Sequence, residues 1–140
     1  MSKQLAIAHI ASEVEPFSKS GGLANVLGSL PNAHKDLGHD VIVITPFYEQ
    51  LIDKNAHNFE VIAENERIEL TKDIWEEVTF LRTTSYGVQI YFVAHSKFFG
   101  ERETLYGGKN ENARFMLFDV AALHLIKKIN FKADIIHCHD

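Results

Sequence analysis

The sequence predicts an α/β fold built on a Rossmann-like parallel sheet with a β-hairpin insertion, and three observations predict it. Nearly continuous apolar runs at residues 5–11 and 40–46 are typical of parallel strands that are buried on both faces. Apolar residues at helical spacing separate these two runs, and strand–helix–strand units of this kind cross over with a right hand. Residues 60–82 instead alternate between apolar and polar residues in part, as half-exposed antiparallel strands do.

The first helix is expected over residues 23–37. It ends before Gly38, because glycine is common just after the last turn of a helix. Pro31 conflicts with one continuous helix, since proline lacks a backbone N–H group and clashes with the preceding turn. Either the helix kinks at Pro31 or two shorter helices meet there.

The sequence pattern of residues 60–140 predicts a hairpin region, a third main strand, a helix and a last strand. The short strands expected in the hairpin region are 60–62, 67–70 and 77–82. After Tyr86-Gly87, residues 88–93 predict the third main strand, and 101–110 predict a loop. Two neighbouring apolar stripes over residues 115–129 indicate a helix that is buried on two flanks. The last strand is expected over residues 133–140.

Composition indicates one domain, residues 1–140, with no need of a disulfide or metal to fold. The chain is 46% hydrophobic and 24% charged, with a net charge of −5. This acidic balance argues against a nucleic acid or an anionic membrane as the main partner. Cys138 is the single cysteine, no apolar run is long enough to span a bilayer, and the start does not read as a signal peptide. We therefore expect a cytoplasmic protein.

The loop between the first strand and the first helix could hold a diphosphate. Gly21 and Gly22 let the backbone approach a ligand closely, and Lys19 adds a point charge suited to phosphate. The unpaired N–H groups at the start of a helix also favour anions. The alternative is a tight turn with a solvated lysine. The loop is neither a Walker A loop nor a G-x-G-x-x-G fingerprint.

His137 and His139 share one face of the last predicted strand, because side chains alternate along a strand. They could bind a metal with Asp140 as a third ligand. Hydrogen bonding at a strand end is the preferred interpretation, because no partner cluster of His or Cys is apparent, so we expect no metal. Trp75 and Tyr106 could pack on a sugar ring, although packing within the protein is the default for both.

Two motifs resemble the glycogen synthase and starch synthase family. The first is SExxPFxKSGGLANVxGxLP at residues 12–31, and the second is DIIHCHD at residues 134–140. GHDV at 38–41 and NxRF at 112–115 follow in the family's order. The resemblance covers essentially the whole chain, although residues 60–82 match in layout more than in sequence.

The resemblance implies that residues 1–140 are the first part of the N-terminal, acceptor-side domain of a GT-B fold. The nucleotide-binding C-terminal domain is then absent from this chain. Family members transfer glucose from ADP-glucose to the non-reducing end of an α-1,4-glucan with retention, in glycogen biosynthesis and without a cofactor. We expect the 140-residue chain alone to be inactive, because the opposite side of the cleft is missing.

The resemblance also assigns roles to residues. It implies that Lys19, Gly21 and Gly22 contact the phosphates of ADP-glucose and that Asp140 is the catalytic carboxylate near the transferred glucose. Donors aimed at the departing ADP stabilise the charge that develops on it. The residues expected to support the site are Glu13, Asn25 and His139.

The chain departs from the family pattern at two positions: Asn25 stands where an aspartate is usual, and Ser20 where a threonine is common. Two other functions stay open. One is a retaining GT-B glycosyltransferase that uses a different nucleotide sugar. The other is a Rossmann-like binding module without turnover.

Overall fold

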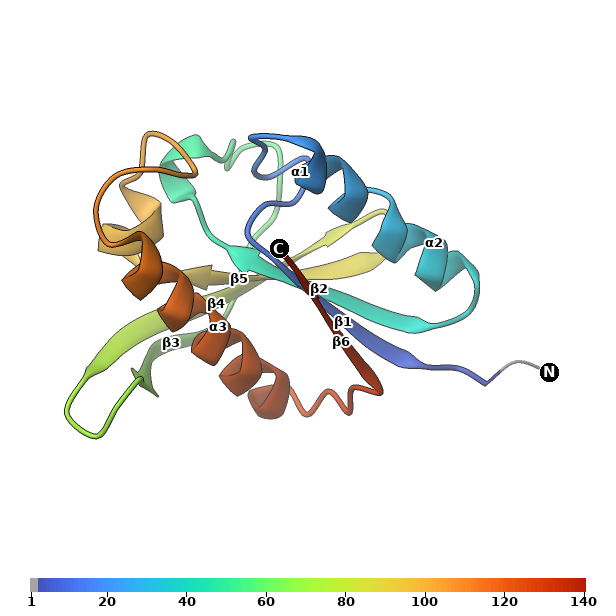
Figure 1. Cartoon of the computed structure of the whole chain (residues 1–140). Coiled ribbons are helices and arrows are strands. Elements are labelled where there is room, and N and C mark those ends of the chain that lie inside the picture. The colour runs from blue at the N-terminus through green and yellow to red at the C-terminus, as the bar shows by residue number, and fades with distance from the viewer. Residues whose placement is uncertain (1–2) are drawn as a thin grey trace.

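A six-stranded sheet with helices on both faces is the frame of the computed structural model, which describes residues 3–140 (Figure 1). The strands are β1 (Ala6–Ala11), β2 (Asp40–Pro46), β3 (Glu60–Glu69), β4 (Trp75–Ser85), β5 (Val88–Ala94) and β6 (Ile135–His139). Their order in the sheet is β3-β4-β5-β2-β1-β6. β5, β2, β1 and β6 are parallel, whereas β3 and β4 pair antiparallel. The α/β class, the parallel strands and the hairpin insertion are therefore confirmed.

The helices form two layers, one on each face of the sheet. They are α1 (Gly22–Leu27), α2 (Leu30–Asp36) and α3 (Glu111–Lys128), with a 3₁₀ turn at Glu49–Leu51 and a π-helical turn at Ser96–Gly100. α1 and α2 cover one face, and α3 lies across the other (Figure 1). Side chains that alternate along β2 enter two separate cores, so that Val43 faces the α1/α2 side and Ile44 the α3 side. None of the helices in residues 3–140 has the length and apolar character that crossing a membrane requires.

Pro31 separates two helices rather than kinking one. α1 ends at Leu27 with Gly28 as its C-cap, and α2 begins at Leu30, so that Pro31 lies in its first turn. Proline is tolerated there, because the first backbone N–H groups of a helix have no partner within the helix. Of the two alternatives that the sequence left open, two shorter helices is the correct one.

The hairpin region holds two long strands, so the expectation of three short ones is wrong. The two segments expected at 60–62 and 67–70 belong to one strand, β3, whose register against β4 shifts between Val61 and Glu66. Asn65 lies in this stretch with φ 54°, and the irregularity breaks the alternation that the sequence shows. A two-residue turn then joins β4 to β5, with positive φ at both Tyr86 and Gly87, as in a type I′ hairpin.

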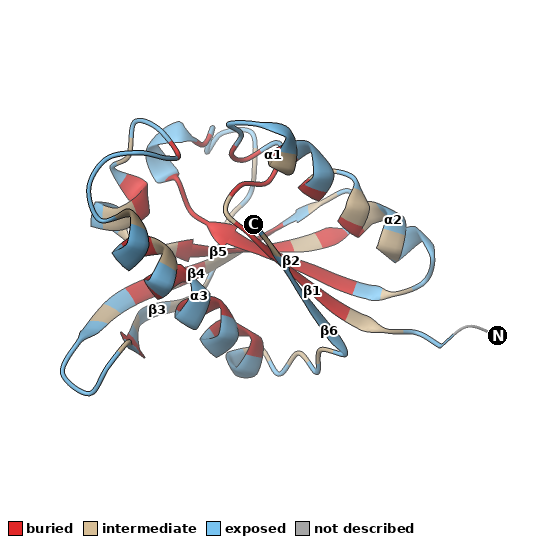
Figure 2. Ribbon diagram, viewed as in Figure 1, coloured by how far each residue is buried: buried red, intermediate tan, exposed pale blue. Residues whose placement is uncertain are grey.

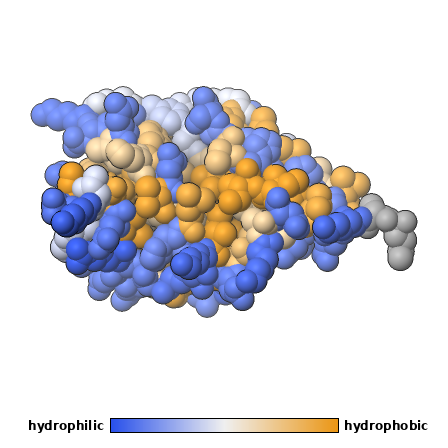
Figure 3. Space-filling view, turned by 60° about the horizontal axis from the view of Figure 1, so that its bottom comes forward, coloured by the Kyte–Doolittle hydropathy of each residue, from blue (hydrophilic) through white to orange (hydrophobic). Residues whose placement is uncertain are grey.

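The predicted burial of the last helix on two flanks is half right. The stripe that contains Phe118 and Leu125 packs on the sheet, but Met116 and Leu123 on the other stripe are 52% and 54% exposed. β6 is the edge of the sheet, so no further strand of the described residues lies beyond it. Figure 2 shows β6 largely exposed beside the buried β1 and β2, and Figure 3 shows an apolar band across this side of the molecule.

Candidate active site

A hollow of about 420 Å³ lies at the carboxyl ends of β1 and β6. Its walls come from the loop after β1, the start of α1, the loop before α3 and the residue after β6. The lining includes Ser12, Glu13, Gly21, Gly22, Tyr106 and Asp140. Ligands of open parallel sheets bind beyond the carboxyl ends of the strands, so we take this hollow as the candidate active site.

Glu13 holds the glycine loop, which we define as residues 12–22. Its side chain is buried, at 3% exposure, and Oε2 accepts a hydrogen bond from the backbone N–H of Ser20. Nearby, the Ser18 hydroxyl accepts from the backbone N–H of Val14 at 3.1 Å. Glu13 therefore braces the backbone immediately before Gly21, and its supporting role in the site stays a prediction.

Gly21 and Gly22 leave open space in front of the loop. A Cβ atom added at Gly22 would meet no atom within 4 Å, and one at Gly21 would meet only Oε1 of Glu13, at 4.0 Å. The packing of the described residues therefore does not require glycine at either position. The room that the missing Cβ atoms leave is the kind that a ligand contacting the backbone needs.

Tyr106 forms the wall opposite the glycine loop. Its hydroxyl lies 2.7 Å from the Ser12 hydroxyl, while Tyr48 donates a hydrogen bond of 2.8 Å to the Ser12 carbonyl. Burial raises the pKa of both phenols, so both stay protonated at neutral pH. Tyr106 lines the hollow, whereas Trp75 lies on β4 outside it, with the Arg67 guanidinium 4.3 Å above its ring.

Arg114 anchors the segment that carries Tyr106. It is only 1% exposed, donates a 2.7 Å hydrogen bond to Glu111, and donates another to the carbonyl of Leu105. Its guanidinium also lies 4.3 Å from the centre of the Phe115 ring. Arg102 binds the same Glu111 carboxylate at 3.2 Å. Two arginines thus hold the loop between the π-helical turn and α3.

Asp140 is shared by two hollows. Besides the hollow in front of the glycine loop, it lines a second one of about 440 Å³, together with Ser12, Phe115 and His139. Asp140 and Gly21 are far apart in the sequence and meet because β6 pairs with β1 in parallel. The structure thus brings the expected catalytic carboxylate to the expected glycine loop.

Lys19 lies on the glycine loop but outside the lining of the hollow. Its side chain is 50% exposed, and Nζ is 4.0 Å from a carboxylate oxygen of Glu15. An exposed ion pair at this distance contributes little to stability. The described structure therefore does not bring Lys19 into contact with the other predicted site residues.

Asn25 is exposed on α1 and does not line the hollow. The hydrogen bonds of residues 3–140 use its backbone carbonyl, which accepts from the Ser29 hydroxyl at 3.1 Å, and none uses its carboxamide. The described structure therefore gives Asn25 no side-chain contact with the other predicted site residues.

His139 belongs to a chain of imidazoles that the sequence pattern does not predict. Its Nε2 is 2.9 Å from Nδ1 of His9 on β1, and Nε2 of His9 is 3.1 Å from Nδ1 of His34 on α2. Burial, and then the neighbouring imidazoles, lowers the pKa of His9 to about 4. Burial also lowers the pKa of His139. One signal was available: His9 is the only polar residue of the first apolar run.

Comparison with known proteins gives consistent matches. The family profile described as the starch synthase catalytic domain matches residues 6–140. Glycogen synthase from Geotalea uraniireducens is 37% identical over 142 residues, which cover 97% of this chain and 28% of that protein. Glycogen synthase from Streptococcus agalactiae is 36% identical over 138 residues, with the same two coverages.

A solved structure also matches the fold. The catalytic domain of starch synthase IV from Arabidopsis thaliana, bound to ADP and acarbose, superposes with a TM-score of 0.85 and 33% identity. The match covers 99% of this chain and 28% of that one, so the chain spans little more than a quarter of the relatives it matches. The resemblance inferred from the motifs at 12–31 and 134–140 is confirmed. This chain belongs to the starch synthase catalytic domain family.

Proposed function

We propose that this chain is the first part of the N-terminal, acceptor-side domain of a GT-B glucosyltransferase. The complete enzyme transfers glucose from ADP-glucose to the non-reducing end of an α-1,4-glucan, with retention, in glycogen biosynthesis. The nucleotide-binding domain lies outside residues 1–140. The observation that carries the proposal is the meeting of the Gly21–Gly22 backbone and Asp140 around one hollow beyond the ends of β1 and β6.

The glycine loop is suited to the diphosphate of the donor. When ADP departs, negative charge builds on the leaving phosphate, and preorganised N–H dipoles lower the energy of that transition state. Gly21 and Gly22 present backbone without a Cβ atom, and Glu13 holds the preceding residue by hydrogen bonding to its N–H group. The ammonium of Lys19 reaches the phosphates when its exposed side chain turns from Glu15 toward the ligand.

Asp140 is suited to the glucose that is transferred. Its position between the two hollows leaves the donor phosphates on one side and space for sugar on the other. A carboxylate beside the anomeric carbon favours the positive charge that develops as the glycosidic bond to ADP breaks. His139 then borders the sugar, whereas Tyr106 lines the hollow on the phosphate side.

The relatives support the choice of donor and acceptor. Two of them are named glycogen synthase, and the matching starch synthase structure holds ADP and acarbose. The exposed free thiol of Cys138 is in keeping with a reducing compartment, so we assign the reaction to the cytoplasm.

The test is glucose transfer by the natural gene product. Labelled ADP-glucose and glycogen are expected to give labelled glycogen, and UDP-glucose is expected to be the poorer donor. Asp140→Asn should remove most of the activity while leaving the melting temperature unchanged. Transfer from UDP-glucose but not from ADP-glucose would favour the alternative of a different nucleotide sugar. Normal transfer by Asp140→Asn would remove Asp140 from the site.

The 140-residue chain alone is expected to transfer no glucose. It spans 28% of its relatives, and without the opposite side of the cleft the donor is neither oriented nor shielded from water. ADP release from ADP-glucose with a glucan primer measures this. A turnover of ~1 per second, an ordinary enzyme rate, would contradict the assignment of the nucleotide-binding residues to another domain.

A further inference from the structure

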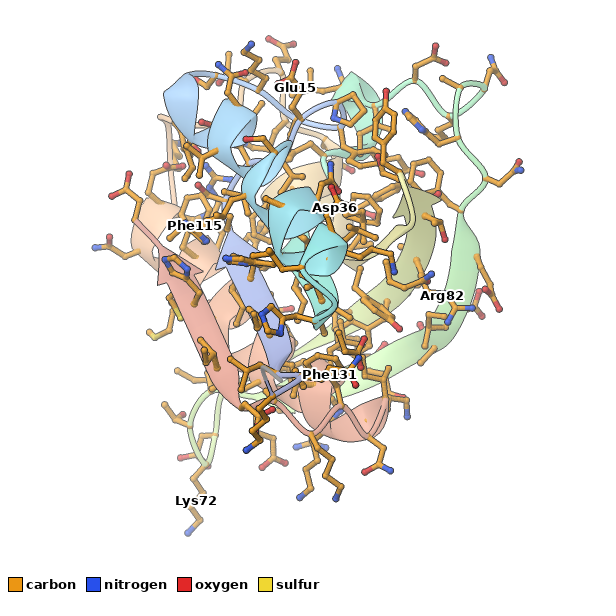
Figure 4. All side chains as sticks on the ribbon, turned by 90° about the vertical axis from the view of Figure 1, so that its right-hand side faces the viewer. Glu15, Asp36, Lys72, Arg82, Phe115 and Phe131 are labelled. Atoms are coloured by element: carbon orange, nitrogen blue, oxygen red, sulfur yellow. The ribbon has the colours of Figure 1, made fainter. Side chains whose placement is uncertain are left out.

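Four histidines converge on the α2 side of the sheet, at its β6 edge. His9 on β1 pairs in register with His137 on β6, and the period of two puts His139 on the same face. His34 on α2 stacks on His9, with 5.2 Å between the ring centres. Figure 4 views this edge and shows β6 beside β1 with α2 next to them. The cluster unites residues from three separate elements.

The ring nitrogens of three of these side chains lie close to one another. One ligand nitrogen from each of His9, His137 and His139 lies within 4.8 Å of the others. One pair, Nδ1 of His9 and Nε2 of His139, is 2.9 Å apart. Two imidazole nitrogens bound to a tetrahedral ion at ~2.0–2.1 Å are separated by ~3.3 Å, so only a small opening of this pair admits a metal.

His9 already has the partner that orients a metal ligand. Its Nε2 is 3.1 Å from Nδ1 of His34, and its side chain is fully buried, so the ring is held in place. When the Nε2–H group of His9 donates to His34, the lone pair of Nδ1 faces His139. Ligating histidines commonly use their second nitrogen in this way, which sets the tautomer and the ring orientation.

The surroundings favour neutral imidazoles. In residues 3–140, no hydrogen bond or ion pair joins any of these four rings to a carboxylate. Positive charge on one ring is repelled by charge on the next, and neutral imidazole is the form that binds metal. A set of borderline nitrogen ligands without carboxylates suits zinc better than magnesium or calcium.

We propose that His9, His137 and His139 bind a zinc ion or a similar first-row divalent cation, with His34 holding His9 from outside the coordination sphere. His139 binds in the tautomer that carries its proton on Nδ1, and the fourth position is left to water. The site does not depend on the proposed glucosyl transfer. It also differs from the ligand set considered from the sequence, because His9 replaces Asp140 as the third ligand.

The competing interpretation is a hydrogen-bonded strand end without a metal, and zinc titration of the full chain separates the two. After metal removal, isothermal titration with zinc is expected to give one ion per chain with a dissociation constant of about 1 μM or tighter. His137→Ala, which changes an exposed side chain, is expected to weaken binding roughly 10-fold or more, as loss of a metal ligand does.

His124→Ala is the matched control, because His124 is a partly exposed histidine on α3, on the opposite face of the sheet. It is expected to bind zinc like the unchanged chain, and melting curves show that each variant is folded. Cobalt(II) is expected to give visible bands of tetrahedral nitrogen coordination without a thiolate charge-transfer band. No zinc binding, equal binding by His137→Ala, or a thiolate band from Cys138 would overturn the proposal.

Discussion

The two walls of the hollow are both held by a buried charged side chain, but in different ways. In the glycine loop, Glu13 binds one backbone N–H group, that of Ser20. In the opposite segment, Arg114 shares the Glu111 carboxylate with Arg102, binds the Leu105 carbonyl and lies over the Phe115 ring. The buried charge of the glycine loop therefore makes one hydrogen bond, whereas the buried charge of the opposite segment belongs to a network.

Because the two buried side chains make different numbers of contacts, we expect one to affect mainly stability and the other mainly activity. A network that includes aromatic packing and several hydrogen bonds contributes to the folded state as a whole. A single carboxylate behind a glycine backbone contributes mainly to where that backbone lies. We call residues 12–22 the glycine wall, and the segment around Tyr106 that Arg114 anchors the Tyr106 wall. We therefore expect that changes to the Tyr106 wall lower stability and that changes to the glycine wall lower activity.

Arg114→Met is expected to have the largest effect. It leaves the Leu105 carbonyl and the Glu111 carboxylate without their buried partner, and breaking such a pair costs ~3 kcal/mol of the free energy of unfolding. Urea unfolding measures the loss. Arg67→Met is the control, because the Arg67 side chain is 54% exposed, and it should change stability by less than ~0.5 kcal/mol. Equal stability of the two variants would contradict the claim that the Arg114 network stabilises the fold.

Glu13→Ala is expected to reduce kcat/KM of the natural gene product about 100-fold with a smaller change in melting temperature. Freeing the Ser20 amide lets the glycine backbone move, and a displacement of about 1 Å is enough for a loss of this size. Glu13→Gln keeps an acceptor oxygen and should retain more activity. Glu15→Ala, a change to an exposed carboxylate on the same loop, should act like the unchanged enzyme. Similar losses of kcat/KM in Glu13→Ala and Glu15→Ala would contradict a specific role for the Glu13–Ser20 hydrogen bond.

Lys19→Ala is expected to lower kcat about tenfold, because a hydrogen bond to a charged group contributes ~1.5 kcal/mol or more. The charge on the departing ADP is largest in the transition state, so KM should change less than kcat. Lys19→Arg should restore activity only in part, since a planar fork does not replace a point charge. Steady-state kinetics with ADP-glucose measures this effect. An unchanged kcat would mean that Lys19 does not contact the phosphates and that only backbone N–H groups of the glycine loop do.

Asn25→Asp is expected to have the smallest effect, a change in kcat/KM of less than about threefold. The carboxamide of Asn25 makes no hydrogen bond within residues 3–140, and α1 leaves it exposed. Kinetics of the two forms measure the effect. A gain well above threefold would show that the aspartate usual in the family contributes charge to the glycine wall, and a large loss would give the carboxamide a contact of its own.

Local pattern was enough to predict most of the parallel sheet. The β-branched and apolar residues of β1 and β2 are buried on both faces, as their composition indicates. Local pattern could not predict that β3 is one strand, because the irregularity at Asn65 interrupts its alternation. Nor could it predict that Met116 and Leu123 are exposed in the described residues, since a local pattern does not show which of two apolar stripes packs on the sheet.

The candidate site could be predicted only in part, because local motifs name residues but do not specify tertiary contacts. The glycines and Asp140 follow from motifs in two segments, and their meeting follows from parallel pairing of β1 with β6. The contact of His9 with His139 and His34 depends on register and on where α2 crosses the sheet. Neither the register nor the position of α2 can be inferred from the spacing of the histidines in the sequence. The distance of Lys19 from the hollow depends on side-chain conformation, which a motif does not specify.

The position of β6 has a consequence for the motions of residues 3–140 taken by themselves. Within residues 3–140, β6 pairs with β1 alone, and the Asp134 carboxylate at its start accepts a 2.8 Å hydrogen bond from the backbone N–H of Ala6. Edge strands with few buried contacts open more readily than central strands. Each opening of β6 would carry His139 and Asp140 away together, leaving the glycine loop in place on the rigid end of β1. Hydrogen exchange in β6 therefore reports how often the site comes apart.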